Sequence, residues 1–143
     1  MDTQVTAHAR LRVSLHDAHY GGGDGIAAGA FVLRVFGDLV TEITIRTDGD
    51  EGLLAEYESV KFTSPVMPGD YIEADATLLR RTRLRRTVAL EARKVIAARY
   101  HERETKAEVL SEPVVVCRAI ATTVVPFGVV TENQRMKGLC NDA

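Results

Sequence analysis

One segment of this chain, residues 25–46, restricts the possible folds more than any other. Its apolar residues recur at helical spacing and cover most of the helix circumference; they are Ile26, Ala27, Ala30, Phe31, Val32, Leu33, Val35, Phe36, Leu39, Val40 and Ile43. Its only polar line is Arg34, Asp38 and Glu42, which are four residues apart and therefore lie on one narrow stripe. Such a helix must be surrounded by other elements, and the turn residues at 48–52 (DGDEG) end it.

Strand patterns flank this helix on both sides. Residues 6–15 alternate apolar and polar side chains, which predicts a half-buried strand before the helix. After the helix, residues 53–62 and 71–79 read as strands joined by a turn that contains two prolines and Gly69. The basic segment 80–86 reads as a hairpin connection.

Three further segments complete the pattern. A strand follows the basic hairpin, with Val88, Leu90, Ala92 and Ile96 on its core face. Residues 100–112 form a charged excursion with room for a helical turn. Residues 113–125 are apolar on both faces, as expected of a central strand that is covered on each side.

One long apolar helix followed by about four antiparallel strands predicts an α+β hot-dog fold, in which a curved sheet wraps around one central helix. A split barrel or an α+β sandwich uses the same ingredients. The length of 143 residues and the 45% apolar content suit one domain, placed at residues 1–126 and followed by a tail at 127–143. Hot-dog protomers usually dimerise so that two sheets run on into each other, so a homodimer is expected.

Charge and cysteine content exclude several classes. The formal charge of −2 gives no general attraction to nucleic acid or anionic membranes, and no apolar run approaches the roughly 20 residues that span a bilayer. The N-terminus lacks an export signal, which favours the cytoplasm. Cys117 and Cys140 have no metal-like spacing and are expected to be unpaired thiols, so no metal site is predicted.

Residues 16–23 (HDAHYGGG) carry more chemistry than any other segment. They place two imidazoles, a carboxylate, a phenol and three bare backbone amides between a strand pattern and a helix pattern. Free N–H groups at the positive end of a helix can stabilise a developing negative charge. This loop is therefore the predicted reaction site.

Several motifs resemble known enzymes. Residues 62–73 (FTSPVMPGDYIE) resemble the strand-turn-strand signature of hot-dog acyl-CoA thioesterases and enoyl-CoA hydratases. A narrower set resembles the 3-aminobutyryl-CoA ammonia-lyases of anaerobic lysine fermentation and their relatives that act on β-alanyl-CoA. That set comprises residues 17–22 (DAHYGG), 37–42 (GDLVTE), 48–50 (DGD), 91–95 (EARKV) and 117–119 (CRA).

The resemblance implies an enzyme that reversibly removes ammonia from a 3-aminoacyl-CoA, giving crotonyl-CoA from 3-aminobutyryl-CoA. Coenzyme A is then part of the substrate and no cofactor is needed. The implied assembly is a homodimer or a trimer of dimers. Such a reaction needs a base for the α-proton, donors for the enolate oxygen and an anion beside the leaving ammonium.

The loop supplies candidates for the first two tasks. Asp17 is the expected base, with His19 sharing that task or orienting the carboxylate. The backbone amides of Gly21, Gly22 and Gly23 are expected to bind the thioester oxygen, and Tyr20 to hydrogen-bond the thioester or the amine. The structural alternatives are a turn-capping Asp17, a surface His19 and a tyrosine packed at an interface.

Residues outside the loop supply the other charges. Glu42 is expected to face the ammonium, either within its own protomer or across a dimer interface, with Asp38 supporting it; the alternative is a solvent-exposed ladder with Arg34. Lys61, Arg93 and Lys94 are candidates for the CoA phosphates. Lys94 falls on a core face, so its ammonium needs a compensating partner.

Other functions remain compatible with these residues. A hot-dog acyl-CoA thioesterase would use Asp17 or Glu42 to activate water against the thioester, and an enoyl-CoA hydratase would use the same acid and base for a different nucleophile. A non-catalytic acyl-CoA-binding protein would keep only the fold.

Overall fold

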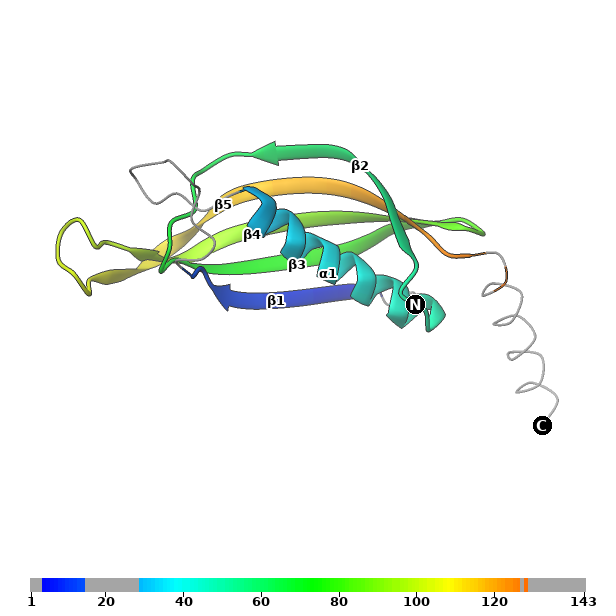
Figure 1. Ribbon diagram of the computed structural model, residues 1–143, viewed down its shortest axis with the longest axis horizontal. Helices are drawn as coiled ribbons and strands as arrows, with labels where there is room; N and C mark the ends of the chain where they lie inside the picture. The colour runs from blue at the N-terminus through cyan, green and yellow to red at the C-terminus, as the bar shows by residue number, and fades with distance from the viewer. Residues whose placement is uncertain (1–3, 15–28, 127, 129–143) are drawn as a thin grey trace.

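The computed structural model describes residues 4–14, 29–126 and 128. Its elements are β1 (Thr6–Arg12), α1 (Gly29–Asp48), β2 (Leu53–Phe62), β3 (Tyr71–Arg81), β4 (Arg85–Ala98) and β5 (Ala107–Val124). The strands form one curved antiparallel sheet in the order β1-β3-β4-β5-β2 (Figure 1). This is the predicted arrangement of one helix and a curved sheet. Apart from Gly128, the predicted tail at 127–143 lies outside the described residues.

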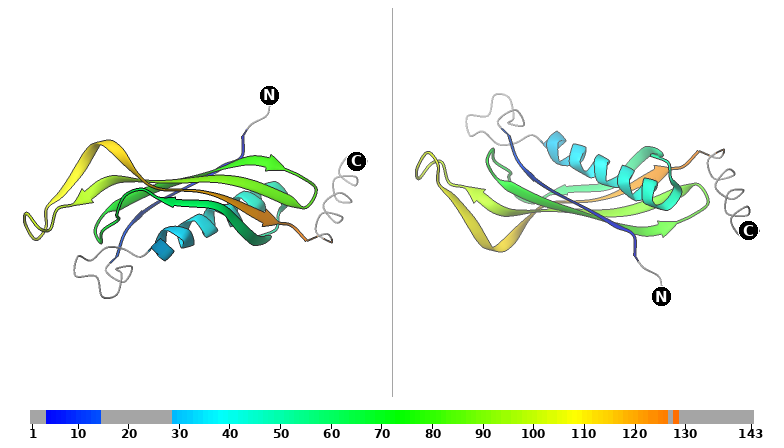
Figure 2. Two further views of the ribbon diagram at one scale, coloured as in Figure 1. Left: turned by 90° about the horizontal axis from the view of Figure 1, so that it is seen from above. Right: turned by 90° about the horizontal axis from the view of Figure 1, so that it is seen from below.

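Helix α1 lies across one face of the sheet (Figure 2). Its large side chains are buried against that face, with Phe36, Val40 and Ile43 at most 1% exposed. The sheet contributes small side chains opposite them, namely Ala74, Ala76, Ala92, Ala119 and Ala121. Large residues on the helix and small ones on the strands let the two layers approach closely and fill the space between them.

Helix α1 and strand β5 are less completely covered by other elements than the sequence pattern predicts. One side of α1 remains open among the described residues, and Ile45 is 46% exposed there. Strand β5 was predicted to be covered on both faces, but Arg118 and Val114 are exposed and Ile120 is only half-buried. That prediction was wrong because no described element covers the face of the sheet opposite α1 (Figure 2).

Several predicted boundaries also change. Strand β1 ends at Arg12, three residues earlier than predicted. The charged excursion is shorter than predicted, because β5 begins at Ala107 and its first residues pair with the end of β4. Charged side chains are accepted in this part of β5 because the hairpin extends past the helix and its side chains remain in solvent.

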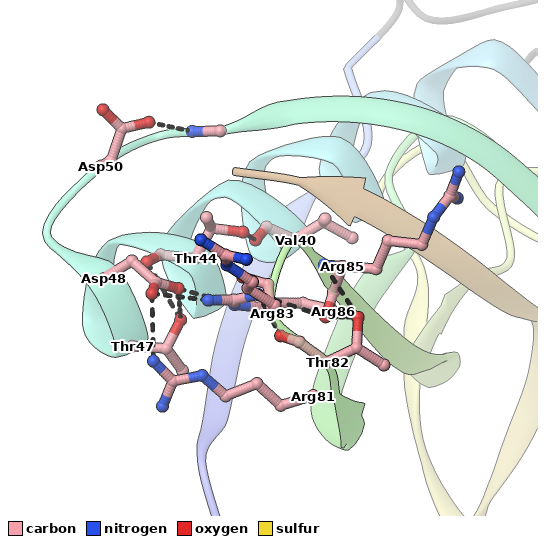
Figure 3. A network of polar contacts seen from close by, with 11 residues as sticks. Val40, Thr44, Thr47, Asp48, Asp50, Arg81, Thr82, Arg83, Arg85 and Arg86 are labelled. Atoms are coloured by element: carbon pink, nitrogen blue, oxygen red, sulfur yellow. Dashed lines mark hydrogen bonds and ion pairs between the residues drawn. The ribbon is translucent and has the colours of Figure 1, made fainter. Parts of the chain in front are cut away.

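The end of α1 is attached to the β3–β4 hairpin by a buried ion pair (Figure 3). The guanidinium of Arg86 donates to both carboxylate oxygens of Asp48, each at 2.7 Å, and Arg81 adds a third contact at 3.1 Å. Arg86 also donates to backbone carbonyl oxygens of the hairpin turn, including that of Thr82 at 2.9 Å. The basic segment is therefore the predicted hairpin connection, but Arg86 lies inside the protein at 1% exposure.

Candidate active site

The predicted reactive loop, with Asp17, His19, Tyr20 and the three glycines at 21–23, lies outside the described residues. The structure does describe the residues on either side of it. The backbone N–H of Val13 donates to the carbonyl of Asp70 at 2.9 Å, and the N–H of Gly69 donates to the carbonyl of Val13 at 2.8 Å. At the other side, Gly29 begins α1 in contact with the ring of Phe62. Both flanks of the loop therefore contact the β2–β3 connection.

Asp70 organises that connection. Its carboxylate is fully buried and accepts backbone hydrogen bonds from Ala98 at 2.7 Å and Met67 at 2.8 Å. The ammonium of Lys94 lies 3.0 Å from the same carboxylate and donates to the carbonyl of Pro65 at 2.9 Å. The predicted need for a partner to Lys94 is thus confirmed, and the pair attaches the turn at residues 65–70 to β4.

Gly69 is required at this turn for two reasons. Its φ of +93° is a conformation that side chains with a Cβ rarely adopt. A Cβ there would also collide with the hydroxyl of Tyr100, to which Arg12 donates at 3.2 Å. The geometry of this turn therefore depends on a bare backbone at Gly69.

The two carboxylates predicted on the helix lie away from the flanks of the loop within one protomer. Glu42 is thirteen residues beyond Gly29, which at about 1.5 Å per residue places it roughly 20 Å along the helix. Its carboxylate accepts a hydrogen bond from Arg46 at 2.8 Å and remains 39% exposed. Asp38 is exposed on the same helix. A single protomer does not bring these groups to the start of α1.

Tyr57 is a polar residue near the start of α1 that the sequence analysis missed. Its hydroxyl donates to the carbonyl of Leu33 at 3.2 Å, and burial raises its pKa. Burial also raises the pKa of the Cys117 thiol to about 11. Cys117 is a free, fully buried cysteine, so it is a poor nucleophile at neutral pH. No signal in the sequence distinguished Tyr57 from a packed aromatic residue.

The three cations predicted to bind CoA lie at two different places in the structure. Lys61 and Arg93 line a shallow cavity of about 530 Å³ on the open face of the sheet, whereas Lys94 is engaged beside Asp70. The cavity also contains Asp75, Glu91 and Arg118, which the sequence analysis did not select.

These cavity charges form a connected network. Arg93 pairs with both Asp75 and Glu91, and Arg118 donates to Glu91 at 2.9 Å. Hydrogen bonds from Arg118 and Arg93 lower the pKa of Glu91. Burial tends to raise the pKa of Asp75, but hydrogen bonds from His8 and Arg93 outweigh it and hold that pKa below its ordinary value.

The described residues meet the requirements of neither a metal site nor a membrane-spanning helix. The described part of the chain contains no group of three or more His, Cys, Asp or Glu side chains placed to hold a metal ion. Nor does α1, its long helix, have the length and apolar content to cross a membrane.

Comparison with known proteins gives clear relatives, although no family model matches the chain. The chain is 47% identical over 117 residues to the 3-aminobutyryl-CoA ammonia lyase of Acetoanaerobium sticklandii, which covers 82% of this chain and 91% of the relative. The structure resembles the β-alanyl-CoA:ammonia lyase of Clostridium propionicum with a TM-score of 0.81 and 27% identity, covering 87% of each chain.

More distant structures share the fold. A hexameric thioesterase of Yersinia pestis matches with a TM-score of 0.66 and 14% identity, covering 82% of this chain and 84% of that one. The hot-dog fold predicted from the sequence is therefore confirmed.

Proposed function

This chain belongs to the 3-aminobutyryl-CoA ammonia-lyase family, and on that premise we propose that it reversibly removes ammonia from 3-aminobutyryl-CoA to give crotonyl-CoA. Its class is that of a carbon–nitrogen lyase acting on a CoA thioester. The choice of substrate rests on 47% identity to the aminobutyryl relative, against 27% to the β-alanyl enzyme. The predicted place in anaerobic lysine fermentation, in the cytoplasm, is part of this proposal.

The loop at residues 16–23 carries the proton chemistry in this proposal. Asp17 takes the α-proton, with His19 orienting it or sharing the proton, and the amides of residues 21–23 bind the enolate oxygen. Tyr20 hydrogen-bonds the thioester or the amine. The hydrogen-bonded turn around Asp70 favours this assignment, because a base must be held within hydrogen-bond reach of the proton it removes.

The leaving ammonium needs a carboxylate, which we assign to Glu42 of a second protomer, with Asp38 supporting it. Within its own protomer Glu42 lies roughly 20 Å along the helix from Gly29, far from the flank of the loop at the start of α1. Strand β2 is a free edge of the sheet, and its Leu53 and Leu54 are 66% and 46% exposed. An exposed apolar edge strand favours pairing with another copy, in a homodimer or a trimer of dimers.

The phosphates of CoA need a cation. Arg93 and Lys94 already have carboxylate partners, whereas Lys61 has no ion pair among the described residues. Lys61 is therefore the preferred candidate of the three for a CoA phosphate.

Incubation of crotonyl-CoA with the enzyme tests the reaction. We expect the enoyl absorbance to fall only when ammonium is added, because ammonia is the nucleophile in the reverse direction. Loss without ammonium would indicate a hydratase, release of free thiol a thioesterase, and no change an acyl-CoA-binding protein. In the forward direction we expect kcat/KM for 3-aminobutyryl-CoA to exceed that for β-alanyl-CoA by roughly 10-fold or more, since one methyl group in a pocket contributes about 1–3 kcal/mol.

Glu42→Gln tests the role across protomers. We expect kcat to fall roughly 100-fold or more with little change in the melting temperature, because the ion pair that Glu42 makes with Arg46 is exposed and contributes little to stability. Arg46→Gln is the matched control, since it removes the same ion pair and keeps the carboxylate. An unchanged kcat in Glu42→Gln would show that Glu42 has no part in the reaction and is only an exposed residue of the helix.

A further inference from the structure

The open face of the sheet carries a single charged row that crosses all five strands. The strand pairings place His8 opposite Asp75, Asp75 opposite Glu91, Glu91 opposite Arg118, and Arg118 opposite Lys61. In spatial order from β1 to β2 the row therefore reads imidazole, carboxylate, carboxylate, guanidinium and ammonium. The two carboxylates are neighbours on β3 and β4, the guanidinium and the ammonium are neighbours on β5 and β2, and the imidazole lies beyond the carboxylates on β1.

Ion pairs with neighbouring side chains fix the two carboxylates of the row. Asp75 and Glu91 are adjacent carboxylates, an arrangement that is destabilising unless a cation joins them. Arg93, in the next row, contacts both of them, and only 23% of its side chain is exposed. His8 contacts Asp75 at 2.6 Å from the other side. These contacts hold the two carboxylates and Arg93 in position before any partner arrives.

A neighbouring row leaves space for another layer. It consists of Thr6, Thr77, Ala89, Ile120 and Ser59, all short or apolar and all on the same face. Packed sheets stand about 10 Å apart, which suits small side chains beside long charged ones. The cavity of about 530 Å³ lies over these two rows.

The sequence of charges is complementary to itself under a two-fold rotation. An axis that runs along the strands between β4 and β5 places Glu91 against Arg118 of the second copy and Asp75 against Lys61 of the second copy. Each contact occurs twice in such an interface. A shift of the axis by half a strand spacing in either direction places Glu91 against itself or Arg118 against itself. Only this register therefore places an opposite charge against each of Asp75, Glu91, Arg118 and Lys61.

We propose that this face packs against the same face of a second copy of the chain, as an interface additional to the free β2 edge. An anionic ligand fits the cavity less well, because the three cations that line it, Lys61, Arg93 and Arg118, lie beside two carboxylates that neutralise most of their charge. The outer contact uses Lys61, which is also the candidate for a CoA phosphate, so the test uses the central pair.

Arg118→Glu is the decisive variant, with the particle mass measured by light scattering during gel filtration at low micromolar concentration. The substitution places like charges together at both central contacts, so the number of chains per particle is expected to fall at least two-fold. Adding Glu91→Arg to this variant restores opposite charges and is expected to restore the mass. Arg99→Glu is the matched control, because it loses a comparable exposed ion pair, with Glu108, outside the row. An unchanged mass in Arg118→Glu would overturn the interface.

Cross-linking provides a second measurement that does not depend on charge. Thr77 and Ser59 are three strand spacings apart in one chain, about 14 Å, but face each other between copies in the matched register. With Cys140 replaced by Ser, the double variant Thr77→Cys and Ser59→Cys is treated with a bis-maleimide of about 10 Å span. A covalent product that neither single variant gives is expected, and its absence would overturn the register. The ammonium-dependent crotonyl-CoA assay reports separately on the proposed function.

Discussion

Asp17→Asn is expected to lower kcat for ammonia elimination by at least roughly 100-fold to 10,000-fold, the range over which a positioned general base contributes. An amide has nearly the shape of a carboxylate but cannot take up the α-proton. The amides at residues 21–23 and the contacts to CoA would remain, so binding of the CoA thioester is expected to stay measurable. The two effects separate in a comparison of initial rates with equilibrium binding of crotonyl-CoA.

Exchange of the α-proton gives a more direct measure of the same step. In D₂O the wild-type enzyme is expected to exchange the α-hydrogen of the substrate, and Asp17→Asn is expected not to. Asp24→Asn is the matched control, since it removes a second carboxylate from the same segment without touching residues 16–23. Wild-type turnover in Asp17→Asn would remove this residue from the mechanism and transfer the search for the base to His19.

Arg86→Met is expected to lower the free energy of unfolding by about 3 kcal/mol and the melting temperature by roughly 10 °C. The side chain of Asp48 is only 3% exposed, and the substitution removes the guanidinium that donates to both of its carboxylate oxygens while the contact from Arg81 is kept. A buried charge that loses its partner costs more than the pair contributed. Thermal unfolding measures the effect, with Arg80→Met, on the exposed part of β3, as the matched control.

The pH dependence identifies the cause of this loss. Burial tends to raise the pKa of Asp48, but hydrogen bonds from Arg86 and Thr47 and the charges of Arg86 and Arg81 hold it below its ordinary value of 3.8. The stability that this carboxylate contributes is present above pH 3.8 and is lost as the pH falls through the lowered pKa. Without Arg86 burial dominates and the carboxylate binds a proton more readily when folded. The difference in free energy of unfolding between the wild type and Arg86→Met is therefore expected to become smaller as the pH falls from 7 towards 4.

A double variant separates the ion pair from its packing. Asp48→Leu combined with Arg86→Met removes both buried charges and is expected to regain most of the lost stability. A double variant as unstable as Arg86→Met would show that the guanidinium acts mainly through its hydrogen bonds to the hairpin turn.

The sequence predicted the local parts of the candidate site. The strand predicted at 6–15 and the turn with two prolines and Gly69 follow from alternation, proline and glycine alone, and the structure joins the two by hydrogen bonds of Val13 with Gly69 and Asp70. The need for a partner to Lys94 was also readable, because an ammonium on a core face must be compensated. The identity of that partner, Asp70, was not readable, because it lies 24 residues away, in the turn before β3.

What the sequence by itself determined was the helix, the alternating strands, their order of inward and outward faces, and the family motifs. These depend on neighbours a few residues apart, and a periodicity records them directly. Only the tertiary structure decided that Arg86 is buried, that Arg93 joins Asp75 to Glu91, and that one charged row crosses five strands. Alternation gives the face on which a side chain lies but not the register of the strand beside it. Contacts between distant residues depend on that register, which the chain acquires only when its strands pair.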